Sequence, residues 1–183
     1  MEARHKRLVQ MFDSLTDTEI SCWSGVEMAL TEGRVGGEVW DDMTVPFLQM
    51  LYVDARFVDG TCWRFATEHV GCLWGLSAID SDKLGADASV MDGIYRSSIL
   101  SCLPCGVVRG VEISTADCLI ENVKIVFDTS SLRLSAGEVY EQHDGSFRIV
   151  PQDESVLIQV DDAHPRQNNA QHHKSDRAGE SEA

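Results

Sequence analysis

The sequence predicts an α+β fold, in which a mainly antiparallel β-sheet with a C-terminal meander over about residues 106–160 has an N-terminal helix packed on it. Two observations support this prediction. Apolar residues recur at helical spacing near the N-terminus, and they alternate with polar residues in short segments toward the C-terminus. Turn-forming residues separate those segments, as is typical of antiparallel sheets. A small β-sandwich is the alternative arrangement. We expect a single globular domain over residues 1–162 and a disordered polar tail over 163–183.

The N-terminal region predicts a helix followed by a strand. Over residues 4–15 the apolar side chains fall on one side of a helix. From Glu19 onward, apolar residues alternate with small or polar ones, which favours a strand. Gly25 indicates a bulge in that strand, and a helix over 26–30 is the alternative. The apolar positions of the N-terminal helix are Leu8, Met11, Phe12 and Leu15.

The middle of the chain predicts a β-hairpin. Residues 48–58 fit a strand or a helix that begins near the preceding proline, and we prefer the strand because Asp59 and Gly60 follow it. An Asp-Gly pair between two β-prone runs is a strong hairpin signal, since the tight turn needs positive φ angles. Trp63 and Phe65 share one face of the return strand. The elements expected next are a strand over 69–80 and a loop over 80–95.

The C-terminal half predicts an antiparallel meander. Each segment alternates apolar and polar residues, and each boundary carries a turn signal such as Asp144-Gly145 or Gln152-Asp153. Sequential strands usually pair, so we expect one sheet. The tail after residue 162 contains no large apolar side chain and cannot bury enough surface to offset the entropy of ordering. The five expected strands are 106–114, 120–128, 131–141, 146–151 and 154–160.

The charge of the chain lies in its body. Thirty acidic residues face 15 basic ones, which gives a formal net charge of −15, and residues 11–160 account for all of it. Such a surface repels nucleic-acid phosphates and anionic membranes, and it attracts basic proteins. The N-terminus has no apolar run of signal-peptide length, and no stretch approaches about 18 apolar residues. We therefore expect a cytoplasmic protein with no nucleic acid and no membrane among its partners.

Six cysteines without an export signal predict reduced, mostly buried thiols. Cys102 and Cys105 have the spacing of a metal or redox pair. The expected strand after them differs from the helix start that thioredoxin-like motifs occupy, and no second pair of this spacing exists to complete a zinc site. Buried structural thiols are the first interpretation, and a domain stabilised by metal at Cys102 and Cys105 is an alternative.

A second alternative is a small enzyme with a dispersed site. Cys62, His69, Cys72 and His143 are the available nucleophile and base candidates, and carboxylate pairs such as Asp153 and Glu154 could do acid–base work. The chain lacks the usual catalytic and phosphate-binding signatures, among them a nucleophile elbow, a P-loop, a dinucleotide fingerprint and a zinc-protease motif. We expect no cofactor, and we favour a non-enzymatic role.

The binding candidates are acidic and aromatic. We expect Trp23, Trp63 and Trp74 to lie in the core and Trp40 to be exposed beside two acids. Further acids occur at the expected strand ends near the Asp144-Gly145 turn. The candidate binding residues are therefore Trp40, Asp41, Asp42, Glu138, Glu141 and Asp144.

The resulting hypothesis is a non-enzymatic acidic module that binds or inhibits a basic partner protein. Complementary charge would speed the association of the two proteins. In charge and size alone, the chain is similar to bacterial immunity proteins that neutralise nuclease toxins, and it carries no motif of a specific family. Edge strands of the meander could also pair with a second copy, so a homodimer is possible.

Overall fold

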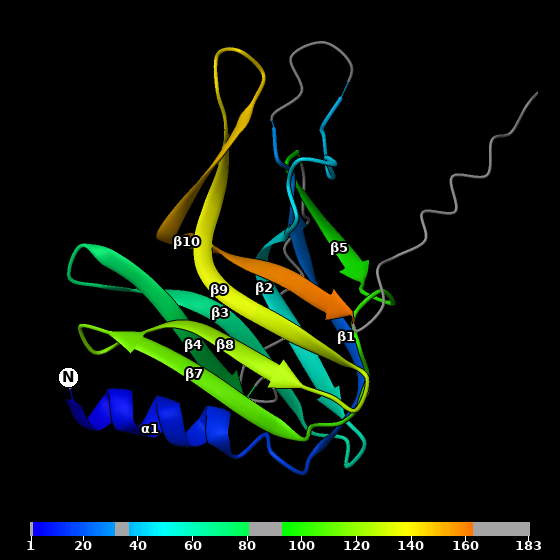
Figure 1. The fold of residues 1–183 in the computed structure, drawn as a ribbon, viewed down its shortest axis with the longest axis vertical. Coiled ribbons are helices and arrows are strands. Elements are labelled where there is room, and N and C mark those ends of the chain that lie inside the picture. Colours follow the sequence, from blue (N-terminus) through cyan, green and yellow to red (C-terminus); the bar gives the residue numbers. More distant parts are fainter. Residues whose placement is uncertain (1, 32–36, 81–92, 163–183) are drawn as a thin grey trace, which may run out of the picture.

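A computed structural model describes residues 2–31, 37–80 and 93–162 (Figure 1). The tail over 163–183 and most of the loop expected over 80–95 lie outside the described residues. Within them, one helix precedes ten strands. No helix in the described ranges has both the length and the apolar character needed to cross a bilayer. The elements are α1 (Glu2–Asp13), β1 (Glu19–Met28), β2 (Leu48–Phe57), β3 (Cys62–Val70), β4 (Leu73–Asp80), β5 (Tyr95–Ile99), β6 (Gly106–Val107), β7 (Gly110–Ala116), β8 (Leu119–Val126), β9 (Ser130–Glu141) and β10 (Phe147–Asp162).

The strands form one antiparallel sheet that curls into a half-barrel. Its main order is β4-β3-β2-β10-β9-β8-β7, and β1 pairs with the other edge of β2 and with the short strands β5 and β6. The predicted antiparallel sheet and N-terminal helix are therefore confirmed. The alternative prediction, a small β-sandwich, concerns how the sheet packs and stays a prediction.

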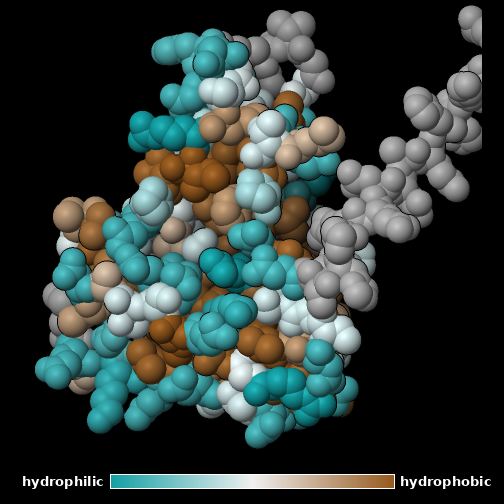
Figure 2. All heavy atoms as spheres, viewed as in Figure 1, coloured by the Kyte–Doolittle hydropathy of each residue, from teal (hydrophilic) through white to brown (hydrophobic). Residues whose placement is uncertain are grey.

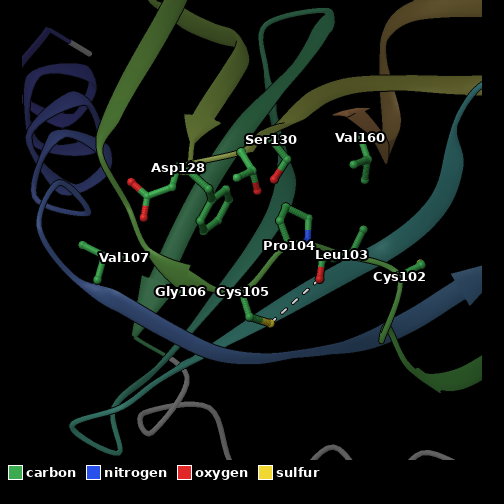
Figure 3. A pocket seen from close by; sticks show the side chains of 11 residues that line it. Cys102, Leu103, Pro104, Cys105, Gly106, Val107, Asp128, Ser130 and Val160 are labelled. Atoms are coloured by element: carbon green, nitrogen blue, oxygen red, sulfur yellow. Dashed lines mark hydrogen bonds between the residues drawn. The ribbon is translucent and has the colours of Figure 1, made fainter. Parts of the chain in front are cut away.

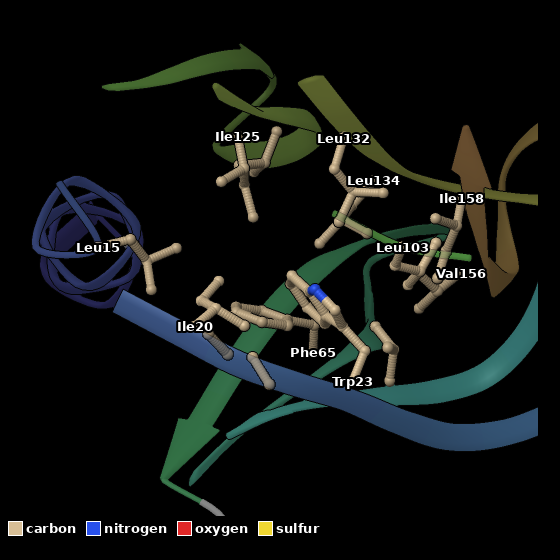
Figure 4. Packing of buried hydrophobic residues seen from close by; sticks show 14 of the residues in the cluster. Leu15, Ile20, Trp23, Phe65, Leu103, Ile125, Leu132, Leu134, Val156 and Ile158 are labelled. Carbon is tan, nitrogen blue, oxygen red and sulfur yellow. The ribbon is translucent and has the colours of Figure 1, made fainter. Parts of the chain in front are cut away.

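The main core fills the concave side of the sheet. Figure 4 shows side chains from β1 and β3 pointing toward those from β8, β9 and β10 across this interior. Phe12 of α1 stacks on Phe65 at 5.7 Å between ring centroids, and Trp23 packs beside Phe65 at 6.2 Å. The indole Nε1 of Trp23 donates a hydrogen bond of 2.7 Å to the carbonyl oxygen of Pro104, so this buried polar group is satisfied. Helix α1 thereby closes one end of the half-barrel.

A second apolar cluster lies on the opposite face of the sheet. Leu157 belongs to it, whereas its neighbours Val156 and Ile158 belong to the main core, as the alternation of side chains along a strand requires. The buried side chain of Gln49 connects β2 to β9 on this face, because its Oε1 accepts a 2.6 Å hydrogen bond from the backbone N–H of Val139. The other members are Leu30, Val45 and Val139, with Phe47 and Phe147 packed against them.

Strand β1 corrects one prediction about Gly25. The strand is present, but the register of β1 against β2 is regular at Gly25, and the irregularities lie on either side, after Ile20 and after Val26. Gly25 instead permits close packing of two backbones, since a Cβ placed there would lie 2.5 Å from the carbonyl oxygen of Tyr52. The absence of a side chain, and not a bulge, explains the glycine.

The C-terminal meander differs from its prediction in two places, and a strand before it was not predicted. Residues 106–114 divide into β6, which leaves the meander to pair with β1, and β7, which pairs with β8. The expected turn at Gln152-Asp153 does not reverse the chain: the two expected strands over 146–151 and 154–160 are one strand, β10, with a bulge between Pro151 and Val156. Finally, the polar edge strand β5 has no clear alternation in the sequence and was not predicted.

Replacing Gly25 with alanine tests the close backbone contact. We expect Gly25→Ala to lower the free energy of unfolding by about 1–3 kcal/mol, because the added methyl group overlaps the backbone of β2. Urea denaturation followed by circular dichroism measures the change. Gly110→Ala is the matched control, since a Cβ there meets nothing within 4 Å. Equal effects of the two substitutions would refute the close-packing argument.

Candidate functional site: an acidic β-hairpin

Strands β9 and β10 form a long hairpin that extends beyond the rest of the sheet (Figure 1). Its turn is the predicted Asp144-Gly145 pair, in which Gly145 has a φ of 82°. The Asp144 carboxylate accepts hydrogen bonds from the backbone N–H and hydroxyl of Ser146 at 3.0 and 2.6 Å, which lowers the pKa of Asp144. The outer end of the molecule is largely hydrophilic in Figure 2. This tip is therefore a polar surface with a fixed turn.

A bulge at the base of the hairpin brings further acids to it. Gln152 adopts a left-handed conformation with a φ of 56°, and the register of β10 against β9 shifts between Pro151 and Val156. The hydroxyl of Thr67 on β3 donates a hydrogen bond to the carbonyl oxygen of Glu154, which anchors the bulge to the neighbouring part of the sheet. Asp153 and Glu154 are consequently held near β9.

Glu138 is the buried member of this group. Its exposed fraction is 7%, and its Oε2 atom has no hydrogen-bond partner among the residues that the structure describes. Burial, assisted by repulsion from Glu154 and Asp153, raises the pKa of the Glu138 carboxyl to about 7. An acid with this pKa is about half protonated at neutral pH. The hairpin thus holds a carboxyl group whose charge state responds to its surroundings.

Tyr140 shares the face of β9 that carries Glu138. Its hydroxyl donates a 3.1 Å hydrogen bond to Asp153, and the ring is partly exposed. Burial, the hydrogen bond to Asp153 and the nearby charge of Glu138 raise the pKa of Tyr140 to about 12, so the phenol stays neutral. Sequence reasoning did not select Tyr140, although alternation along the strand places it on the side of Glu138. The sequence indicated Asp153 and Glu154 only as a carboxylate pair for acid–base work and not as part of the binding site.

The candidate binding residues fall into two separate groups. Glu138, Glu141 and Asp144 lie together on the hairpin, and Glu141 and Asp144 are exposed. Asp41 and Asp42 instead line a cavity of about 430 Å³ beside Ile158 to Val160, at the other end of β10. The carboxylate of Asp42 accepts hydrogen bonds from Thr44, which lowers the pKa of Asp42.

Trp40 is half-buried rather than exposed. The guanidinium of Arg96 lies over its ring at 4.1 Å from the centroid, and Arg96 also forms a 2.7 Å ion pair with the buried Glu27. The ring and the cation are thus engaged within the molecule. Of the two acidic groups, the hairpin is the one with carboxylates that extend away from the body.

The cysteines do not follow their prediction. Cys62 is buried, but the remaining five, including Cys102 and Cys105, are exposed free thiols. The two line a cavity of about 410 Å³, and Figure 3 shows that their side chains do not point toward each other. Burial raises the pKa of the Cys105 thiol. In the part of the chain that the structure describes, no group of three or more histidines, cysteines or acids is placed to hold a metal ion.

The fold separates some of the residues considered for a dispersed enzyme site. Cys62 and His69 lie at opposite ends of β3, seven residues apart at about 3.3 Å per residue. The ring of His69 packs on that of Trp74, with 5.1 Å between the ring centroids, and His69 is exposed. His143 lies in the turn of the β9–β10 hairpin. Cys72 lies in the β3–β4 turn, three residues from His69, so Cys72 and His69 remain the candidate pair for this alternative.

Comparison of the chain with family models, with curated proteins and with solved structures finds no match. The site is therefore interpreted from its own chemistry.

Glu138 should make stability depend on pH. Because burial raises its pKa above that of the unfolded chain, the folded state binds more protons, and stability falls as pH rises from about 5 to above 7. As pH rises from 5 to 8.5, we expect the free energy of unfolding of Glu138→Gln to increase by about 1–3 kcal/mol relative to that of the wild type. Urea denaturation at each pH measures this. Glu141→Gln, an exposed change on the same strand, is the control. A difference between wild type and Glu138→Gln that does not vary with pH would contradict the assignment.

Proposed function

We propose that this chain is a non-enzymatic acidic module that binds a basic partner protein through the β9–β10 hairpin. The observation that carries the proposal is the density of acids there: residues 138–154 contain five acidic residues, one arginine (Arg148) and no lysine. They lie on a hairpin that extends from the body (Figure 1), and Glu141, Asp144 and Glu154 are exposed there. Charge of one sign on a protruding surface favours a partner of the opposite sign.

The ion pairs of the body support this choice of surface. Within the described residues the carboxylates paired with arginine or lysine lie on other elements or at the far end of the hairpin strands, whereas Glu138, Glu141, Asp144, Asp153 and Glu154 are not paired with a base. Exposed pairs add little stability but cancel charge locally. The charge of these hairpin carboxylates is therefore not cancelled by a paired base, as is also true of exposed acids elsewhere on the body such as Asp13 and Glu38. The pairs are Arg4–Glu68, Arg64–Asp54, Arg96–Glu27, Arg109–Asp128, Lys124–Glu112 and Arg133–Asp161.

The hairpin also offers a centre for such an interface. Tyr140 and Ile149 are 41% and 42% exposed and lie between the acids of the tip and those of the bulge, Tyr140 on the face of Glu138 and Ile149, paired with Val139, on the opposite face. Partly exposed aromatic and aliphatic side chains surrounded by charge are typical of interface centres. A partner whose working surface is basic, such as a nuclease, would be inhibited by this docking. Two hairpins of the same sign repel, which disfavours a homodimer through this surface.

The salt dependence of association tests the proposal. Proteins captured at low salt would be identified, and the association rate constant of each would be measured by surface plasmon resonance. For a true partner we expect the rate constant to fall at least about tenfold between about 50 and 500 mM salt, since screening removes the steering. At low salt, the double variant Glu141→Gln/Glu154→Gln should associate with the partner more slowly than the wild type.

A charge-matched variant provides the control. Asp13→Asn/Glu38→Gln removes two exposed carboxylates elsewhere and should leave the rate constant closer to that of the wild type. If every captured protein binds at a rate indifferent to ionic strength, the proposal is wrong. An equal loss in both double variants would mean that overall charge, and not the hairpin, guides the partner.

A further inference from the structure

An apolar groove lies at the end of the molecule away from the β9–β10 hairpin. It runs between the turn that joins α1 to β1 and the turn that joins β2 to β3, and it encloses about 640 Å³. Its floor contains the buried Leu15 and Phe57 and the edge of Trp63, whose ring meets that of Phe57 at 5.7 Å. Val58 forms one wall and is 60% exposed. A β-branched apolar residue with this exposure is available for contact with another molecule.

Backbone hydrogen bonds hold both walls of the groove in place. The N–H of Val58 donates a 2.9 Å bond to the carbonyl oxygen of Glu19, which joins the two turns directly. Asp17, in a left-handed conformation, donates a 2.9 Å bond to Val108. The side chain of Asp59 accepts hydrogen bonds from Thr61 and so fixes the β2–β3 turn. A groove with fixed walls binds a ligand without first losing conformational entropy.

The rim of the groove is acidic. Asp17, Glu19 and Asp59 line it and are all exposed, and no lysine or arginine is among its lining residues. Arg109, which interacts with Asp17, is held by Asp128 through two hydrogen bonds of 2.7 and 3.1 Å, and Arg56 next to Phe57 is not among the lining residues. The hydrogen bonds from Thr61 lower the pKa of Asp59, so this carboxylate stays charged at neutral pH. An apolar floor within an acidic rim selects an apolar side chain with basic neighbours.

We propose that this groove binds one large apolar side chain of a partner protein, in a segment where lysines or arginines flank that side chain. The apolar anchor would cover Val58 and Trp63, and the flanking cations would lie beside Asp17, Glu19 and Asp59. The inference depends on the proposed function only for the basic character of the partner. The groove and the hairpin lie at opposite ends of the long axis in Figure 1, so each is tested without the other.

Two other occupants fit the groove less well. The C-terminal segment 163–183 has no leucine, isoleucine, valine, methionine or aromatic residue and therefore supplies no apolar anchor. A second copy of the chain, placed groove to groove, would bring the three rim carboxylates of each copy together, and like charges oppose such a contact. A basic segment with an apolar anchor satisfies both the floor and the rim.

Synthetic peptides test the groove directly. The probe is a nine-residue peptide with one central tryptophan flanked by lysines, and the comparison peptide has serine in place of the tryptophan. Each peptide is titrated into the full chain labelled with ¹⁵N, and the backbone amide chemical shifts are followed by NMR. These shifts give both the affinity and the location of binding. We expect shifts at residues 15–19 and 57–63 and at least about tenfold weaker binding of the serine peptide.

Val58→Glu separates apolar anchoring from simple charge attraction. Attraction by charge alone would strengthen binding of the lysine peptide, because the variant adds a negative charge. Anchoring in the groove predicts the opposite, a loss of at least about tenfold, because the apolar wall is gone. Ile149→Glu makes the same change on the hairpin and should leave peptide binding at the groove intact. Both sites are exposed, and thermal unfolding confirms that each variant is folded.

Four outcomes would overturn the inference. They are equal binding of the tryptophan and serine peptides, tighter binding by Val58→Glu, shifts confined to the hairpin, and shifts at the groove that grow with protein concentration alone. The last would assign the groove to a second copy of the chain. Failure of the groove test would leave the salt-dependent docking at the hairpin standing, and the converse also holds.

Discussion

A ladder of three residue pairs between β2 and β10 joins the two halves of the sheet. Leu48 to Met50 pair with Val156 to Ile158, and β10 continues from there along β9 while β2 continues along β1 and β3. The same short ladder supplies both cores. Met50, Val156 and Ile158 point into the main core, whereas Gln49 and Leu157 point into the second cluster. Loss of this pairing would separate the halves and expose both apolar clusters.

The bulge in β10 follows from that ladder. The strand pairs with β9 on both sides of the bulge and with β2 only after it, and the extra residues between Pro151 and Val156 allow it to change direction. They also bring Asp153 and Glu154 toward the buried Glu138. Burial and like charge both oppose ionisation of Glu138, so the fold tolerates an unfavourable group at the place where we assign binding.

Local patterns predicted much of the sheet from the sequence. Alternation identified β8 and β9, and the Asp-Gly pairs identified the turns after β2 and β9, because these signals depend on neighbouring residues alone. The turn signal at Gln152-Asp153 was misread for a physical reason. A left-handed polar residue suits either a reversal or a bulge, and the pairing partner β2, about 100 residues away, decides between them. The acids of the hairpin were predictable as strand-end residues. The burial of Glu138 and the contact of Tyr140 with Asp153 were not predictable, because both depend on the path of the β10 bulge back toward β9.

The exposure of five cysteines has a practical consequence for handling this protein. Thiols on β1, on the β3–β4 and β7–β8 turns and on the segment before β6 face solvent, so air oxidation of a concentrated sample would link separate molecules covalently. A dimer band on a gel run without reductant would then report storage conditions and say nothing about native assembly. Alkylation before purification, or serine at those five positions, would remove the artefact.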